Sequence, residues 1–140
     1  MKFNWRLEDK SVCYEKLKRW WDLHEAFEGN HIPYNSMPNR VFTVSTEIEG
    51  ELIDLYSVAI IVTDTDMCWI GWITSNPLFE NHSCKKGALE YLYGIIAIVM
   101  KSQGFESIVA HAKLNGLMKA LENSGFVNAE PKTNFYIKNL

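Results

Sequence analysis

The sequence predicts an α/β protein built on a mixed, largely antiparallel sheet. Residues 41–48, 52–63 and 67–74 are strand-like stretches separated by two short polar turns, a pattern typical of an antiparallel meander. Beyond Pro77 the apolar residues recur at three- and four-residue spacing, which predicts a helix packed on that sheet. A further short apolar strand, residues 107–112, follows this helix.

Length and composition indicate one soluble domain that comprises residues 1–140. A chain of 140 residues is long enough to bury a core of its own. Its 14 basic and 17 acidic side chains give a net charge of −3, which argues against a protein that binds nucleic acid by bulk electrostatics. There is no signal-peptide pattern and no apolar segment of bilayer-spanning length, so we expect a cytoplasmic protein without a membrane partner.

The N-terminal part should form a strand followed by a helix. Residues 3–7 alternate between apolar and polar side chains, which predicts a first strand. Asp9 or Ser11 can cap the helix that follows, whose apolar stripe continues to Phe27 and which Gly29 ends. The next loop contains two prolines, and it either borders a substrate site or simply connects the helix to the meander.

Two tryptophans lie three residues apart in the last strand of the meander. Trp69 and Trp72 have opposite parity in an extended chain, so we expect one of them to face each side of the sheet. One indole ring would then be available to line a pocket or to pack beneath the helices.

The C-terminal half contains two helices that end in glycine followed by phenylalanine. The helix over residues 88–100 contains Gly94, which we interpret as a point of close packing, and it ends at Gly104. A shorter helix ends at Gly125 in the same way, and residues 134–138 form the closing strand.

The polar loop over residues 83–88 is a candidate anion site. It opens the long helix, where free N–H groups and the helix dipole favour a negative charge. Lys85 and Lys86 lie beside Gly87 in this loop. Either a phosphate binds there, or both lysines are solvated surface side chains.

The cysteines and histidines show no metal or disulfide pattern. Cys13, Cys68 and Cys84 form no CxxC pair, which predicts reduced thiols. Cys84 lies at the start of the long helix, so it is either an activated nucleophile or a cysteine without a chemical role. The four histidines lack the spacing of metal ligands, so we expect no metal.

A carboxylate on the meander is a candidate general base. Glu47, Glu49 and Glu51 alternate along its first turn, so all three share one face. Glu47 could deprotonate an amine. The alternative is that the three form a solvated hairpin tip.

The order strand, helix, three-stranded meander, helix, strand, helix, strand resembles the GNAT acetyltransferase superfamily, as does the helix end Leu-Glu-Asn-Ser-Gly-Phe at residues 121–126. The resemblance covers residues 3–138. It implies a single GNAT-like domain with a sheet of about six to seven strands flanked by helices on both faces. It also implies acetyl-CoA as acyl donor, inserted where strands 67–74 and 107–112 splay apart.

The resemblance further implies residues for each part of acetyl-CoA. Five strand residues would pair with the pantetheine arm through their backbone, a loop would hold the pyrophosphate, and an asparagine lies near the family's common position after the penultimate strand. The strand residues are Trp69, Ile70, Gly71, Trp72 and Ile73. The loop residues are Ser83, Cys84, Lys85, Lys86, Gly87 and Ala88, and the asparagine is Asn115.

Two segments depart from the family pattern. The pyrophosphate loop usually runs Gln or Arg, two residues, Gly, one residue, Gly or Ala, whereas the register from Cys84 to Leu89 keeps only Gly87. The family's frequent general acid is a tyrosine four residues before the Gly of Gly-Phe, and Leu121 stands there. The tyrosines that could replace it are Tyr91, Tyr93 and Tyr136.

Two functions from different classes therefore stay open. The chain is either an N-acetyltransferase that moves acetyl to a primary amine of a small molecule or a protein, or an inactive GNAT-fold module that binds a protein partner or its own copies. The segment from Trp72 to Pro77 and the missing tyrosine also resemble small GNAT-like proteins of tailed bacteriophages. That resemblance implies a bacterial or phage-infected cell, or a place in the virion.

Overall fold

The computed structural model describes residues 2–24, 29–112, 115–130 and 135–140, without the side chains of residues 115, 130 and 135. The strands in this part of the chain are β1 (Phe3–Asp9), β2 (Arg40–Ile48), β3 (Glu51–Val62), β4 (Met67–Ser75), β5 (Ser107–His111), β6 (Val127–Glu130) and β7 (Phe135–Asn139). The α-helices are α1 (Lys10–Leu23), α2 (Ala88–Ser102) and α3 (Asn115–Asn123), and the short 3₁₀ turns are η2 (Tyr34–Ser36), η3 (Pro77–Phe79) and η4 (Ser83–Lys85).

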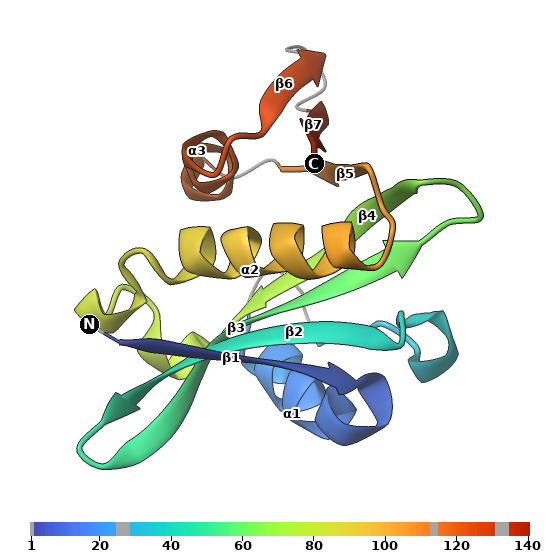
Figure 1. Cartoon of the computed structure of the whole chain (residues 1–140). Coiled ribbons are helices and arrows are strands. Elements are labelled where there is room, and N and C mark those ends of the chain that lie inside the picture. The colour runs from blue at the N-terminus through green and yellow to red at the C-terminus, as the bar shows by residue number, and fades with distance from the viewer. Residues whose placement is uncertain (1, 25–28, 113–114, 131–134) are drawn as a thin grey trace.

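The described strands form one sheet in the order β1-β2-β3-β4-β5-β7-β6. Neighbouring strands are antiparallel except for β4 and β5, which run parallel because α2 carries the chain back across the sheet. Figure 1 shows α1 on one face of the sheet and α2 and α3 on the other. The predicted mixed, largely antiparallel sheet with helices on both faces is confirmed.

Each face of the sheet has its own apolar core. On the α2 face, Phe42, Leu92 and Leu121 belong to the larger cluster of buried side chains. On the α1 face, Trp21 is fully buried in a smaller cluster, and its indole N–H donates to Thr74 Oγ1 at 3.2 Å. A fully buried large apolar side chain contributes about 1.5–3 kcal/mol, so these two clusters hold both helical layers to the sheet.

A bulge at Gly71 changes the direction of the side chains along β4. Opposite β3, Ile70 pairs with Ile60 and Trp72 with Ala59, which leaves Gly71 as the extra residue. Ile70 packs in the α2-side core and Trp72 in the α1-side core. Trp69 points away from the α2 side, because it alternates with Ile70. The prediction that the two tryptophans face opposite sides is therefore wrong, since the bulge puts both on the α1 side.

Two helix boundaries also differ from the predicted ones. α1 ends at Leu23 rather than at Gly29, because His24 is extended (φ −87°, ψ 121°); Phe27 lies outside the described residues. α2 begins only at Ala88, after Gly87 at φ +79°. The two lysines of the loop thus precede the helix instead of occupying its first turn, because the positive φ at Gly87 interrupts the helical conformation.

The short strand β6 was not predicted from the sequence. It has four residues, and its first residue, Val127, is exposed. Its sequence, Val-Asn-Ala-Glu, alternates apolar and polar residues over only four positions, so its pairing with β7 is what defines it as a strand. None of the helices in the described part of the chain is both long and apolar enough to cross a membrane.

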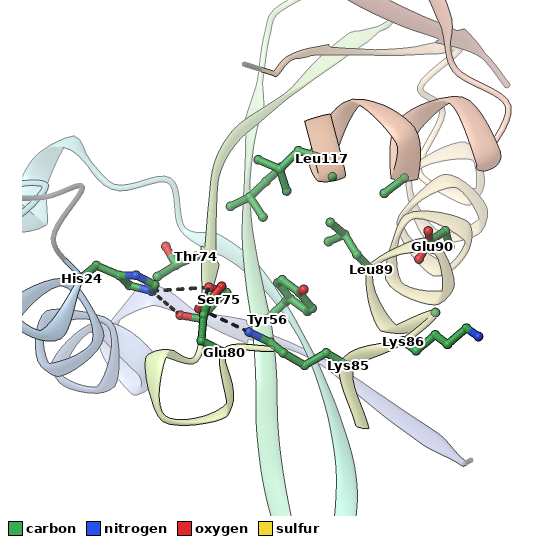
Figure 2. A pocket seen from close by; sticks show the side chains of 14 residues that line it. His24, Tyr56, Thr74, Ser75, Glu80, Lys85, Lys86, Leu89, Glu90 and Leu117 are labelled. Carbon is green, nitrogen blue, oxygen red and sulfur yellow. Dashed lines mark hydrogen bonds and ion pairs between the residues drawn. The ribbon is translucent and has the colours of Figure 1, made fainter. Parts of the chain in front are cut away.

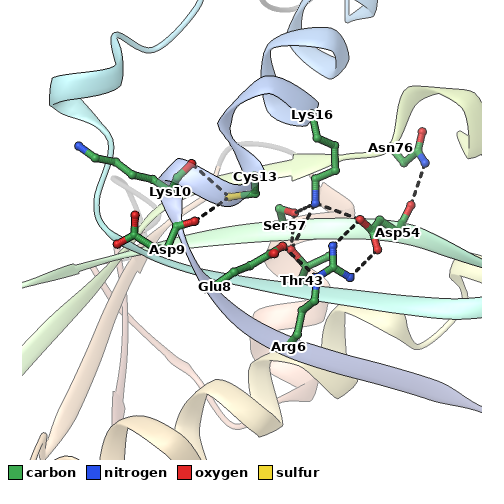
Figure 3. Close-up of polar contacts among 10 residues, drawn as sticks. All are labelled: Arg6, Glu8, Asp9, Lys10, Cys13, Lys16, Thr43, Asp54, Ser57 and Asn76. Carbon is green, nitrogen blue, oxygen red and sulfur yellow. Dashed lines mark hydrogen bonds and ion pairs between the residues drawn. The ribbon is translucent and has the colours of Figure 1, made fainter.

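A polar cluster links the N-terminal elements to the start of the loop between β4 and α2 (Figure 3). Asp54 on β3 accepts hydrogen bonds from Arg6 on β1 and from Lys16 on α1. The backbone carbonyl of Asp54 also accepts one from the Asn76 side chain at 2.8 Å. The Asn76 Oδ1 in turn accepts from the Leu78 N–H at 3.0 Å, so this cluster anchors the loop that leads to α2.

Candidate functional site

The central feature of the sheet is the place where β4 and β5 stop pairing. Their parallel register runs from Met67 opposite Ser107 to Ile70 opposite Ala110. β4 continues to Ser75, and within the described part of the chain its second half does not pair with β5. Beyond Ile70 the backbone edge of β4 is thus not used by β5. The GNAT resemblance implies that these two strands splay apart, but Trp69 and Val109 still pair, so the separation begins only after Ile70.

A cavity of about 550 Å³ lies beside this free edge (Figure 2). Its volume falls in the range of about 300–1,000 Å³ typical of small-molecule sites. Strands β3 and β4, the loop after β4, and the first turns of α2 and α3 contribute to its wall. The lining residues are His24, Tyr56, Ile73, Thr74, Ser75, Glu80, Lys85, Lys86, Gly87, Leu89, Glu90, Gly116, Leu117 and Ala120.

Polar side chains from three segments meet at one end of the cavity. The His24 Nε2–H donates to the Ser75 carbonyl at 2.7 Å, which places the ring proton on Nε2 because a carbonyl oxygen only accepts. The Ser75 hydroxyl donates to Glu80 Oε2 at 3.1 Å, and this carboxylate lies 3.6 Å from Lys85 Nζ. Burial, and then the charge of Glu80, raise the pKa of Tyr56 in the same wall.

Lys85 and Lys86 have different environments. The Lys85 side chain is only 8% exposed, and it points toward Tyr56 and Glu80 inside the cavity (Figure 2). Lys86 is exposed and points away from this cluster. Burial lowers the pKa of Lys85, and the charge of Glu80 partly opposes that effect. The two adjacent lysines therefore cannot have the same role.

The N-terminus of α2 opens toward the cavity beside Lys86. The first intrahelical hydrogen bond runs from the Tyr91 N–H to the Gly87 carbonyl at 3.0 Å. The N–H groups of the three residues between them therefore have no partner within the helix and point out of its end. Together with the helix dipole and the Lys86 ammonium, they form a surface suited to an anion.

The remaining predicted site residues lie in different places. Trp69 and Ile70 pair with β3 on one side and β5 on the other, so the free edge begins at Gly71. Cys84 is buried in the α2-side core, and Ser83 is exposed at the start of η4. Asn115 begins α3, but its side chain lies outside the described residues.

The predicted general base Glu47 is exposed and pairs with Leu52 next to the β2–β3 turn. It is not among the lining residues of the cavity, whereas Glu80 and Glu90 are. The role of Glu47 stays a prediction.

No described tyrosine takes the position of the expected general acid. Leu121 there is fully buried in the α2-side core. Tyr91 packs against Phe3, and Tyr136 donates to Glu122 Oε1 at 3.3 Å. The Tyr93 hydroxyl is buried and has no hydrogen-bond partner in the described part of the chain. None of these three tyrosines lines the cavity.

Sequence reasoning missed His24, Tyr56 and Glu80 as cavity residues. They come from the end of α1, the middle of β3 and the loop after β4, and no spacing in the sequence relates them. Only the end of the strand pattern at Asn76-Pro77 indicated that a loop would leave the sheet here. Among the described residues, no three His, Cys, Asp or Glu side chains gather closely enough to hold a metal ion.

Comparison with known proteins identifies the fold. No protein-family model matches the sequence, and no curated protein matches it either. A domain from Methanocaldococcus jannaschii DSM 2661 superposes with a TM-score of 0.74 at 18% identity, covering 99% of both chains. A chain of the NatC complex, crystallised with a Gag peptide and CoA, gives 0.70 at 13% identity and covers 100% of this chain and 99% of its own.

A GNAT family acetyltransferase from Brucella melitensis, in complex with acetyl-CoA, gives a TM-score of 0.62 at 11% identity. The match covers 99% of this chain and 88% of the Brucella chain. Likeness at such low identity defines the fold and leaves the chemistry to the site. The chain has the GNAT acetyltransferase fold over its whole length.

Proposed function

We propose that this protein is an N-acetyltransferase that uses acetyl-CoA and acts on a primary amine of a small molecule or a protein. The observation that carries the proposal is the free edge of β4 after Ile70, of which Ile73, Thr74 and Ser75 line the cavity together with the N-terminus of α2. A chain with amide groups, such as a pantetheine arm, can pair with an unpaired strand edge. Solved structures of the same fold contain CoA or acetyl-CoA, which supports this assignment.

The residues of the cavity fit the parts of such a ligand. The backbone edge from Gly71 to Thr74 is free of β5 and can hold an extended arm, whereas the Ser75 carbonyl already accepts from His24. The α2 N-terminus with Lys86 can hold phosphate groups. Leu89 and Leu117 give the middle of the cavity an apolar wall. The thioester supplies the activated acyl group, and the protein contributes mainly binding and orientation.

The amine must approach from the polar end of the cavity. Glu80 is about half exposed there and accepts a hydrogen bond from Ser75, so its carboxylate can attract an ammonium group and receive its proton through water. In this proposal Glu80 has the role that the sequence suggested for Glu47.

Calorimetric titration of acetyl-CoA tests the proposal. Gly116 lines the cavity, is exposed, and an added Cβ there meets no atom within 4 Å. Gly116→Phe should therefore fold and block binding by occupying the cavity. Lys101→Phe, which places the same ring on the exposed last turn of α2, should bind like the wild type. Absence of wild-type binding at millimolar acetyl-CoA would overturn the proposal.

The second candidate is an inactive GNAT-fold binding module. The buried Leu121 favours it, because no proton donor occupies the position of the family's general acid. An assay of CoA release from acetyl-CoA with a panel of primary amines separates the two candidates. If the wild type releases CoA and the Gly116→Phe variant does not, the protein is an enzyme. Tight binding without turnover on any amine would favour the module.

A further inference from the structure

Lys85 is a buried amine inside the proposed acyl-donor cavity, and no function described so far uses it. Its side chain is 8% exposed and lies with Tyr56, Ser75 and Glu80 in one wall (Figure 2). The neighbouring Lys86 is exposed and points elsewhere. A lysine whose only purpose were charge on the surface would not be enclosed in this way, because burial of an ammonium group is unfavourable.

The hydrogen bond and the ion pair of the Lys85 ammonium are both long, and its remaining contact is with the face of an aromatic ring. Nζ donates to the Asn76 carbonyl at 3.4 Å, lies 3.6 Å from Glu80 Oε2, and lies 4.8 Å from the centroid of the Tyr56 ring. A charge-assisted hydrogen bond of normal strength is about 2.7–2.9 Å long. The cation is therefore held weakly, which agrees with the direction of its pKa, lowered by burial. The neutral amine, which is a nucleophile, is easier to reach here than on a surface lysine.

Lys85 Nζ lies in the same cavity as the free edge of β4, where the proposed function places an acyl thioester. Ile73, Thr74 and Ser75 of that edge line the same cavity as Lys85, and so does Gly87 at the start of α2. An acyl thioester that extends along β4 from the α2 N-terminus thus shares this space with Nζ. We propose that Lys85 is a self-acetylation site, at which the protein transfers an acetyl group from a bound acyl-CoA to its own side chain.

The reaction is balanced without a further reactant. The Lys85 ammonium first loses a proton to solvent. The neutral nitrogen then forms a bond to the thioester carbonyl carbon, the carbon–sulfur bond breaks, and the sulfur leaves as a thiolate. The second proton passes from nitrogen to the thiolate, directly or through water, which gives an amide and a thiol. The acetylated side chain is neutral and no longer pairs with Glu80.

The inference rests on the proposed function, so the experiment measures binding and modification separately. The wild-type protein is incubated with acetyl-CoA, and acetylation at each lysine is followed over time by peptide mass spectrometry. The exposed lysines Lys101 and Lys119 serve as internal references for purely chemical acetylation. Calorimetry with desulfo-CoA, which cannot donate an acetyl group, reports on the cavity alone.

We expect Lys85 to be acetylated at least about tenfold faster than Lys101 and Lys119, because binding holds the thioester next to it. Desulfo-CoA, as well as prior unfolding in urea, should remove this preference. Lys85→Arg should lose the modification, and the mapping of the wild type decides the question even if that variant folds poorly. Desulfo-CoA binding without preferential modification of Lys85 would overturn the inference and leave the proposed function intact. Absence of desulfo-CoA binding would overturn both.

Discussion

Arg6 on β1 donates two hydrogen bonds to Asp54 on β3, from Nη1 to Oδ1 at 2.7 Å and from Nη2 to Oδ2 at 2.6 Å (Figure 3). Lys16 Nζ adds a third contact to Oδ2 at 3.1 Å. Burial by itself would raise the pKa of Asp54, but the hydrogen bonds and charges of Arg6 and Lys16 outweigh it and hold that pKa below its usual value. The carboxylate thus ties together two strands that flank β2.

This arrangement predicts an acid-sensitive contribution to stability. Because the pKa is lower in the folded chain, Asp54 stabilises the fold above its unfolded-state pKa of about 3.9, and this contribution is lost as pH falls through the folded pKa. Asp54→Asn should lower the free energy of unfolding by about 1–3 kcal/mol at neutral pH. Urea unfolding at several pH values should show that the difference in unfolding free energy between Asp54→Asn and the wild type becomes smaller in acid.

The matched control is Asp64→Asn in the exposed β3–β4 turn, which should change stability by less than about 0.5 kcal/mol. A gap between Asp54→Asn and the wild type that is as large in acid as at neutral pH would contradict the prediction.

A side chain at Gly71 would crowd its neighbours in the bulge. A Cβ there would lie 3.0 Å from Ile61 Cδ1 and 3.3 Å from the Ala59 carbonyl oxygen. We expect Gly71→Ala to destabilise the fold by about 1–3 kcal/mol through overpacking. Ile61→Val removes Cδ1, so it should recover part of that loss in a double-mutant cycle of unfolding free energies. Strictly additive effects would show that Ile61 Cδ1 is not the obstacle, because valine keeps Cγ1, which would lie 3.1 Å from the added Cβ.

Gly94 in the middle of α2, unlike Gly71, has free space around it for a side chain. The interpretation as a point of close packing is wrong, because an added Cβ meets nothing within 4 Å. Gly94→Ala should stabilise the protein by about 1 kcal/mol, since alanine is the better helix former, and thermal unfolding would show a higher Tm. Gly104 has equal free space but lies at φ +96°, so Gly104→Ala should instead lower the Tm.

The cysteines should be unreactive in the native protein. Cys13, Cys68 and Cys84 are free thiols and all are buried. Burial also raises the pKa of Cys68 to about 11, which keeps this thiol protonated at pH 8. A thiol reagent at pH 8 should label none of them before unfolding and all of them in guanidinium. Rapid native labelling of Cys84 would revive the hypothesis of a nucleophilic cysteine.

Local sequence signals account for most of the elements. The Asp9 side chain caps α1 by accepting from the Ser11 N–H at 2.9 Å, as predicted. Gly104 and Gly125 end α2 and α3 at positive φ, and Phe105 and Phe126 each donate a backbone hydrogen bond to the preceding helix. Caps, turns and apolar periods depend on neighbours a few residues away, so the order of the elements can be inferred without coordinates. The expectation of helices on both faces of the sheet comes from the resemblance to the GNAT superfamily.

The site depends on contacts between distant segments, which no local pattern encodes. His24 donates a hydrogen bond to Ser75, which is 51 positions away in the sequence. Lys85 points into the cavity, where its ammonium group contacts the Tyr56 ring and the Glu80 carboxylate. The pairing between β4 and β5 likewise stops at Ile70, directly before the bulge at Gly71, which only the register with β3 reveals. The sequence therefore specifies an acetyltransferase-like scaffold, whereas only tertiary packing decides which strand edge stays free and which side chains enclose it.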